Sequence, residues 1–198
     1  MKKFARFGIP IAIGLTLIAL LVLFWNPILD LLPIDQSHWD VTDQGTFYYN
    51  AKGDRVTGWA DMDSSRYYLD PARDGAMHTG WLELEGNRYY LAPDGRMATL
   101  WQDLGGGRYY FGDTGVMHTG WVDTPQGRFH LTQEGTPYTG WLEEDGRRYW
   151  LDQAGRMITG WMDPEEGRYY SNGDGTLATG WLVTTEGRFH LSQAGTMT

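Results

Sequence analysis

Short stretches in which apolar and polar residues alternate recur along most of the chain, and each one opens with a tryptophan. These tryptophans are spaced 20 residues apart, with one spacing of 22. Their positions are Trp39, Trp59, Trp81, Trp101, Trp121, Trp141, Trp161 and Trp181. Alternation with a period of two is typical of β-strands, and a fixed period of this length is typical of stacked repeats. We therefore expect tandem two-stranded units, each ending in a glycine-containing loop.

The segment "GWLEEDGRRYWL", residues 140–151, predicts how the two strands of a unit pair. Its Asp145-Gly146 sequence is typical of a two-residue β-hairpin turn. With these residues at the turn, the opposed pairs are Glu144 and Arg147, Glu143 and Arg148, Leu142 and Tyr149, and Trp141 and Trp150. An isolated hairpin is marginally stable in water, so the units are expected to stack. The residues expected to fill the gap between neighbouring hairpins are Met97, Met117, Met157, Leu177 and Met197.

Alternation along the strands sorts each hairpin into two faces. One face stays apolar or aromatic from unit to unit, as at Leu82, Tyr89 and Leu91, and is predicted to be packed. The other face carries the tryptophan, a second ring that varies among Tyr, His and Trp, and an arginine, and is the candidate recognition face. Its residues predicted to bind a ligand are Trp59, Tyr68, Trp81, Tyr90, Trp101, Tyr110, Trp121, Trp141, Trp150, Trp161, Tyr170 and Trp181.

An arginine recurs directly before the aromatic pair of each unit from the second onward. In the predicted register, six of these arginines face an acidic residue, whereas Arg188 faces Val183. The six pairs are Arg66 with Asp61, Arg88 with Glu83, Arg108 with Asp103, Arg128 with Asp123, Arg148 with Glu143, and Arg168 with Asp163. One interpretation is a structural ion pair, with the guanidinium also stacked on a neighbouring Trp or Tyr. The other is a polar contact to sugar hydroxyls or to an anionic wall polymer.

The first residues differ in character from the repeats. Lys2, Lys3 and Arg6 precede an uncharged, mostly apolar run from Phe7 to Leu29. About 20 residues of helix span a bilayer core, and basic residues favour the cytoplasmic side. This pattern predicts a cytoplasmic tail at 1–6, a transmembrane signal-anchor helix at 7–32, a linker at 33–38 and eight extracellular repeats at 39–198. The expected fold class is an all-β solenoid, or superhelix, of tandem β-hairpins preceded by one N-terminal transmembrane α-helix.

Composition narrows the functions that these repeats could have. Acidic residues outnumber basic ones by 25 to 16, which disfavours nucleic acid as a partner. There is no cysteine, and the five histidines follow the repeat spacing, so neither a metal nor a cofactor is expected. Carboxylate pairs such as Glu143 and Glu144 recur at turns and not in a single cleft. We therefore expect no enzymatic activity.

Three segments, "GNRYYLAPDGRMATLW", "GRYYFGDTGVMHTGW" and "RRYWLDQAGRMITGW", closely resemble the choline-binding or cell-wall-binding repeat family. Similar repeats occur in the glucan-binding regions of glucansucrases and at the C-termini of large clostridial toxins. The resemblance implies a superhelix of β-hairpins whose ligand sites are formed by aromatic residues of consecutive repeats. It also implies attachment of a surface protein to choline on teichoic acids or to polysaccharide. Some relatives dimerise through terminal hairpins, so a homodimer is possible.

One position departs from the choline-binding pattern. Choline-binding units resemble "GW…WYYL", in which the second tryptophan supplies one wall of an ammonium cage, and this chain has arginine there. A cation beside the cage would repel choline, and a cation–π contact of about 0.5–2 kcal/mol is lost with the ring. We therefore expect a membrane-anchored, extracellular protein of a Gram-positive bacterium that binds cell-wall polysaccharide or glucan. The alternatives are a non-binding spacer or protein-interaction rod, and a choline-binding module with degenerate cages.

Overall fold

The computed structural model describes residues 37–164 and 167–198, which fall into two compact units divided after Val56. The described part of the first unit holds one antiparallel hairpin, in which β1 (His38–Thr42) pairs with β2 (Gly45–Tyr49). Trp39 stands opposite Tyr48 in this hairpin. Thr46 occupies the place that an arginine takes in the later units. This hairpin is called hairpin 1 below.

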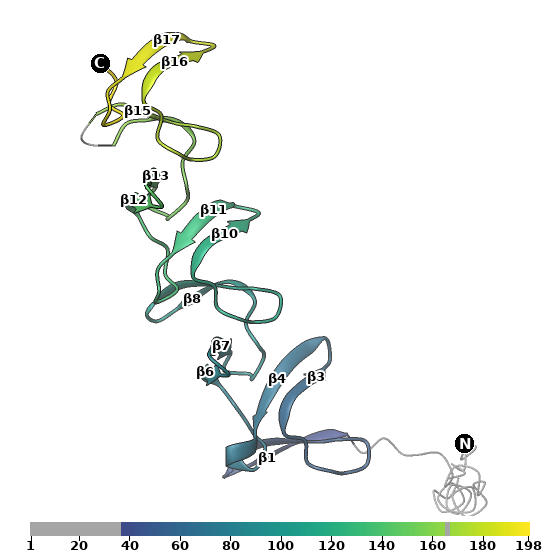
Figure 1. The fold of residues 1–198 in the computed structure, drawn as a ribbon. Coiled ribbons are helices and arrows are strands. Elements are labelled where there is room, and N and C mark those ends of the chain that lie inside the picture. Colours follow the sequence, from purple (N-terminus) through teal and green to yellow (C-terminus); the bar gives the residue numbers. More distant parts are fainter. Residues whose placement is uncertain (1–36, 165–166) are drawn as a thin grey trace, which may run out of the picture. The chain divides into compact units, whose positions relative to one another are not determined.

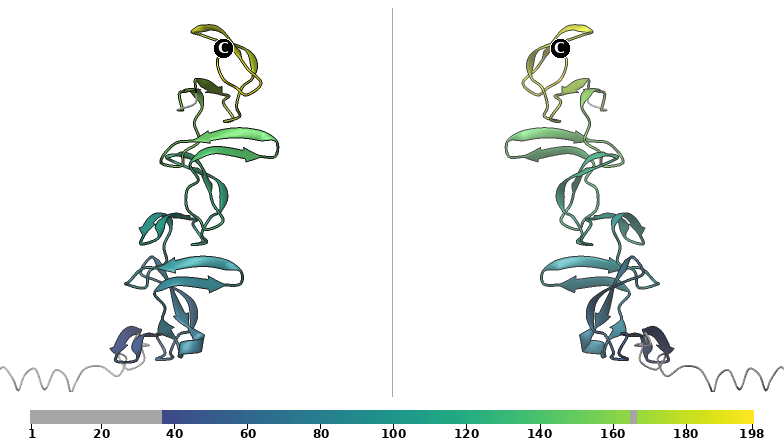
Figure 2. Two further views of the ribbon diagram at one scale, coloured as in Figure 1. Left: turned by 90° about the vertical axis from the view of Figure 1, so that its left-hand side faces the viewer. Right: turned by 90° about the vertical axis from the view of Figure 1, so that its right-hand side faces the viewer.

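The second unit, Thr57–Thr198, consists of seven further hairpins, numbered 2 to 8 in chain order (Figure 1). Their strands are β3 (Gly58–Met62) with β4 (Ser65–Asp70), β6 (Gly80–Leu84) with β7 (Asn87–Leu91), β8 (Leu100–Leu104) with β9 (Gly107–Phe111), β10 (Gly120–Thr124) with β11 (Gly127–Leu131), β12 (Gly140–Glu144) with β13 (Arg147–Leu151), β14 (Gly160–Met162) with β15 (Tyr169–Ser171), and β16 (Gly180–Thr184) with β17 (Gly187–Leu191). Figure 2 shows each hairpin as a separate ribbon joined to the next by a loop.

Hairpin 2 has the longest loop of the array, which accounts for the single spacing of 22 residues. The 3-10 helix η2 (Pro71–Arg73) fills it, and the Asp70 side chain accepts a hydrogen bond from the backbone N–H of Ala72. The strand β5 (Ala76–Met77) then pairs with β4 and makes this the three-stranded sheet of the unit. The insertion is therefore absorbed locally, and the following hairpins keep their repeat.

The register predicted from the Asp145-Gly146 turn is confirmed. β12 and β13 place Glu143 opposite Arg148 and Trp141 opposite Trp150. Both turn residues have a positive φ, 51° and 72°. Two consecutive positive φ angles are the geometry of a type I′ turn, whose twist matches that of the flanking strands.

Consecutive hairpins are held together by a regular backbone hydrogen bond. The second residue after the loop glycine donates its N–H to the carbonyl of the arginine in the preceding hairpin, at 2.7–2.8 Å. The five bonds run from Met97 to Arg66, Met117 to Arg88, Met157 to Arg128, Leu177 to Arg148, and Met197 to Arg168. Pro137 stands at the equivalent place opposite Arg108 and has no N–H to donate. As predicted, the side chains of four of these residues lie against the glycine of the next loop, whereas Met197 is 40% exposed. The four are Met97, Met117, Met157 and Leu177.

The core of the second unit lies mainly at the junctions between hairpins. The residue that pairs with the first residue of the first strand is almost completely buried in all seven hairpins, at 0–1% exposure: Leu69, Leu91, Phe111, Leu131, Leu151, Ser171 and Leu191. At the junction of hairpins 3 and 4, Phe111 and Tyr109 cluster with Met117, and Trp81 of the preceding hairpin packs against them. No hairpin could bury this surface alone, which is the physical reason for the array.

The expected fold class requires a correction. The only helix among the described residues is η2, whose three residues rise about 6 Å, far less than the roughly 30 Å of a bilayer core. Across 37–164 and 167–198, no helix has the length and hydrophobicity that crossing a membrane requires. The segment 7–32, to which the transmembrane helix was assigned, lies outside the described residues. The fold that the described residues support is an all-β hairpin repeat.

Candidate functional site

Each tryptophan from hairpin 2 to hairpin 7 lies between two aromatic rings. The ring centroid of Trp101 is 5.1 Å from that of Tyr110 in its own hairpin and 4.9 Å from that of Phe129 in the next. The partners in the same and the next hairpin are Tyr68 and Tyr89 for Trp59, Tyr90 and Tyr109 for Trp81, His130 and Tyr149 for Trp121, Trp150 and Tyr169 for Trp141, and Tyr170 and Phe189 for Trp161. The structure thus brings together the predicted ligand-binding rings within each hairpin.

The predicted separation into a packed face and an exposed recognition face needs revision. The recognition face of one hairpin packs on the packed face of the next, so Tyr68 is only 8% exposed. Trp181, in hairpin 8, is 64% exposed and contacts His190 of its own hairpin. Sequence reasoning missed the contact between each tryptophan and a ring of the following hairpin, although the constant spacing of these two residues could have indicated it. In five of the six pairs, Trp81 onward, the partner ring follows the tryptophan by 28 residues.

An arginine covers the tryptophan ring in each of hairpins 2 to 8. Its guanidinium carbon lies 4.2–4.9 Å from the ring centroid of the tryptophan diagonally across the hairpin, two residues from the arginine's own partner. The shortest distance, 4.2 Å, belongs to Arg188 over Trp181, where Val183 and not a carboxylate stands opposite the arginine. The stacked position therefore does not depend on an ion pair. A cation already lies against the aromatic surface that an ammonium ligand would need.

The six acidic residues lie beside their arginines at the rim of each hairpin. Carboxylate oxygens are 3.1–3.7 Å from the arginine Nε, and the acidic side chains are 71–86% exposed. Exposed ion pairs contribute about 0.2–1 kcal/mol, because water and salt screen them. A guanidinium on an indole contributes about 0.5–1 kcal/mol when exposed and about 2 when desolvated. Stacking is thus the larger of the two interactions that hold the arginine.

Hairpin 4 offers a direct comparison of these two interactions. We expect Asp103→Asn to lower the free energy of unfolding by less than about 0.5 kcal/mol, since the pair is exposed. Arg108→Ala should cost about 1 kcal/mol or more, because the indole loses both the cation and the aliphatic stem. Urea unfolding followed by tryptophan fluorescence measures both. Equal losses in the two variants would show that the ion pair dominates instead.

One carboxylate makes a different contact, from hairpin 6 back to hairpin 5. Glu144 accepts a hydrogen bond from the indole Nε1 of Trp121. Its other oxygen lies 3.6 Å from Nε2 of His130. The residues at this place in the other hairpins of the second unit are Met62, Leu84, Leu104, Thr124, Pro164 and Thr184. The junction of hairpins 5 and 6 is therefore closed by a carboxylate, which no other hairpin of the second unit has at this place.

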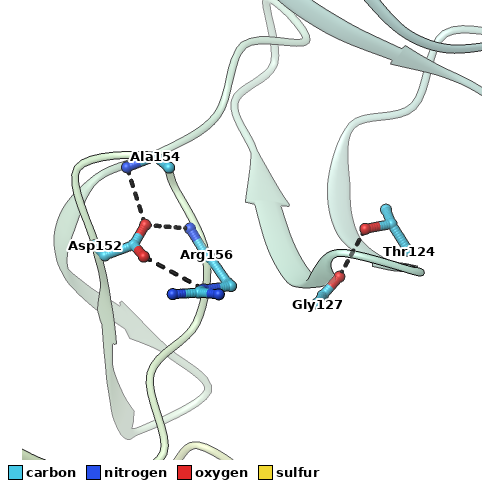
Figure 3. Close-up of polar contacts among 5 residues, drawn as sticks. All are labelled: Thr124, Gly127, Asp152, Ala154 and Arg156. Atoms are coloured by element: carbon cyan, nitrogen blue, oxygen red, sulfur yellow. Dashed lines mark hydrogen bonds and ion pairs between the residues drawn. The ribbon is translucent and has the colours of Figure 1, made fainter.

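The loops between hairpins are ordered by side-chain oxygens. Asp152 accepts hydrogen bonds from the backbone N–H groups of Ala154 and Arg156, both at 2.9 Å, and its second oxygen lies 3.3 Å from the Arg156 Nε (Figure 3). In the next loop, hydrogen bonds from the hydroxyl and the backbone N–H of Thr176 lower the pKa of Asp174. No three His, Asp or Glu side chains group as metal ligands within 37–164 and 167–198.

Comparison with known families agrees with this geometry. Residues 56–100 match the choline-binding repeat, and residues 101–117 and 139–157 match the putative cell wall binding repeat. The matched repeats belong to the choline-binding and cell-wall-binding repeat family. Together they carry hairpins 2, 3, 4 and 6, so the repeats of this family hold four of the Trp–Arg clusters described above. No curated protein matches the chain.

Several solved structures are similar to the chain. CbpJ from Streptococcus pneumoniae TIGR4 is 30% identical with a TM-score of 0.68, covering 78% of this chain and 56% of CbpJ. Choline binding protein F from Streptococcus pneumoniae is 29% identical with a TM-score of 0.70, covering 82% and 57%. The choline-binding domain of CbpL from the same species is 28% identical with a TM-score of 0.63, covering 82% and 87%. The chain thus spans little more than half of CbpJ and of choline binding protein F.

Proposed function

We propose that the hairpin array is a non-catalytic module that binds a polymer of the cell wall and acts outside the cell. The observation that carries this proposal is the recurrence of one cluster, Trp with Arg and a second ring, in seven consecutive hairpins. Weak sites repeated along one chain gain avidity on a polymeric ligand and gain little on a monomer. Similarity to cell-wall-binding repeats supports the same class of ligand.

The saccharide part of the wall is the ligand class that fits these clusters best. Indole and phenol rings suit the apolar face of a pyranose, and the exposed Asp and Glu side chains at the rim can accept hydrogen bonds from its hydroxyls. The predicted ligand-binding residues, from Trp59 to Trp181, remain our candidates. Choline binding protein F has been solved in the presence of a peptidoglycan analogue, a tetrasaccharide-pentapeptide. That protein is similar to the chain in fold, which supports testing peptidoglycan first.

Choline is the second candidate, and similarity to several choline-binding proteins favours it. Against it stands the guanidinium over each tryptophan from Trp59 to Trp181. A second cation would have to displace that guanidinium or share the ring with it, and like charges repel. Choline binding by these seven clusters should therefore be weak.

Retention of the full chain on isolated cell walls tests the proposed function. We expect the protein to sediment with walls and with purified peptidoglycan, and choline chloride should not release it. A variant with Trp59, Trp101 and Trp141 changed to Ala should bind several-fold less, because avidity falls as sites are lost. Release by millimolar choline would favour the second candidate. Failure of a folded protein to bind any wall fraction would support a spacer and contradict the proposal.

A further inference from the structure

The junction of hairpins 6 and 7 contains a groove of about 560 Å³. Its walls include Trp141 and Trp150 from hairpin 6, Asp152 and Gln153 from the loop that follows, and Asp163 and Pro164 from hairpin 7. This volume lies within the range of about 300–1,000 Å³ that is typical of small-molecule sites. The groove is separate from the cation stack, because Arg148 covers Trp141 from within the hairpin, 4.4 Å from the ring centroid, and does not line the groove.

Two substitutions in the repeat pattern account for the groove. At the preceding junction Glu144 binds both Trp121 and His130 of hairpin 5, and its side chain occupies this space. The equivalent residue of hairpin 7 is Pro164, whose ring is shorter and has no hydrogen-bond acceptor. Among the described residues, no carboxylate equivalent to Glu144 therefore fills the space beside Trp141 and its partner ring.

The second substitution is Trp150, which stands where the other hairpins have Tyr or His. In hairpin 4, His118 of the following loop lies against the equivalent ring, Tyr110, at 5.5 Å between centroids. In hairpin 6 the loop residue at this place is Ile158, whose N–H bonds to the Trp150 carbonyl. Trp150 is thus the largest ring of the series, and the loop residue beside it is aliphatic, as Ala98 and Ala178 are in hairpins 3 and 7.

Both carboxylates that line the groove among the described residues are paired with an arginine. The Asp152 carboxylate is held by two backbone N–H groups and by Arg156 (Figure 3). Asp163 is offset by Arg168, with 3.6 Å between Oδ1 and Nε. Because each carboxylate has its own guanidinium, the groove offers acceptors without a large excess of negative charge. This balance favours a neutral ligand with hydroxyl groups over a cation.

We infer that this groove is a specific binding site for one neutral pyranose unit of a wall glycan. The sugar packs into the angle of 65° between the indoles of Trp141 and Trp150, and its hydroxyls donate to Asp163 and exchange hydrogen bonds with Gln153. The inference deepens the proposed function, since it assigns one ligand class to one junction of the array. It differs from the repeated clusters because it depends on Trp150 and Pro164, which occur in no other described hairpin of the second unit at these places.

Titration of the full chain with two trisaccharides, chitotriose and isomaltotriose, tests this site. We expect at least one to shift the Trp150 indole N–H signal in an NMR spectrum, with millimolar affinity. Pro164→Glu restores the carboxylate that closes the preceding junction and should weaken binding at least tenfold. Trp150→Tyr restores the common ring of the series and should have a similar effect. Near-UV circular dichroism shows whether each variant keeps its packing.

Thr184→Glu is the matched control, because it places the same carboxylate at the next junction, where Tyr170 and not Trp150 is the partner ring. It should leave trisaccharide binding unchanged. Unchanged binding by a folded Pro164→Glu variant would overturn the inference, as would displacement of the sugar by choline chloride. Walls retained by the full chain without any trisaccharide effect at Trp150 would refute this site and leave the proposed function standing. Trisaccharide binding without wall retention would support this site and contradict the proposed function.

Discussion

Replacing Arg108 and its six counterparts with tryptophan is expected to give the chain millimolar affinity for choline. The change removes the guanidinium that lies 4.2–4.9 Å from each tryptophan ring and supplies a second indole in its place. Each additional ring contributes about 0.5–2 kcal/mol to cation–π attraction, and the repulsion from the resident cation disappears. Isothermal titration with choline chloride measures the result.

The matched control for this experiment is the same set of positions changed to methionine. Methionine removes the charge and keeps an apolar chain against the indole, so it separates relief of repulsion from the gain of an aromatic wall. We expect the methionine variant to bind choline much more weakly than the tryptophan variant. Both sets lose six exposed ion pairs, each worth about 0.2–1 kcal/mol, so their stabilities should fall alike. A folded tryptophan variant that remains indifferent to choline would contradict the explanation given for the arginines.

A large loss of stability from a single substitution is expected for Gly115→Ala, at about 2–5 kcal/mol. Gly115 has a φ of 79°, and left-handed backbone costs an L-residue about 1–2 kcal/mol. A Cβ there would also lie 2.3 Å from the Sδ and 2.7 Å from the Cγ of Met97. Overpacking of this kind typically adds about 1–3 kcal/mol. The loops of hairpins 3 and 4 would have to separate, and urea unfolding should show the loss.

Gly120→Ala supplies the control, since Gly120 has a similar φ of 71° and no atom within 4 Å of an added Cβ. It should cost only the backbone strain. Combining Met97→Ala with Gly115→Ala should recover part of the packing loss, and a double-mutant cycle measures that coupling. If Gly115→Ala and Gly120→Ala were equally destabilising, the contact between Met97 and Gly115 would not contribute to the effect.

Much of each hairpin could be predicted from local residues. Asp145-Gly146 was enough to place Glu143 opposite Arg148 and Trp141 opposite Trp150, because a two-residue turn determines the pairing of both strands. A stack of the arginine on a neighbouring Trp or Tyr was expected, and the structure shows that the ring is the tryptophan. The position between hairpins of the second residue after the loop glycine could also be predicted, since its recurrence has the period of the array.

The candidate site was only partly predictable. The rings within one hairpin were identified, but Tyr89, Phe129 and their equivalents were assigned to a packed face without their contact to the tryptophan of the preceding hairpin. The groove beside Trp150 was not predicted. The effect of Pro164 becomes clear only from the contacts that Glu144 makes at the equivalent place one junction earlier. The expected transmembrane helix rested on hydropathy alone, and the described fold is all-β.

The amino-acid sequence by itself determined the number of residues per repeat, the turn, the register and therefore which arginine faces which acid and which indole. These features depend on interactions between residues a few positions apart on either side of one turn. Only the tertiary structure decided that Trp101 meets Phe129, that Met97 lies against Gly115, and that a groove opens between Trp150 and Pro164. Those contacts depend on the rotation and translation from one hairpin to the next. Spacing along the chain specifies neither the rotation nor the translation. Both are set by how the complete surfaces of two neighbouring hairpins pack.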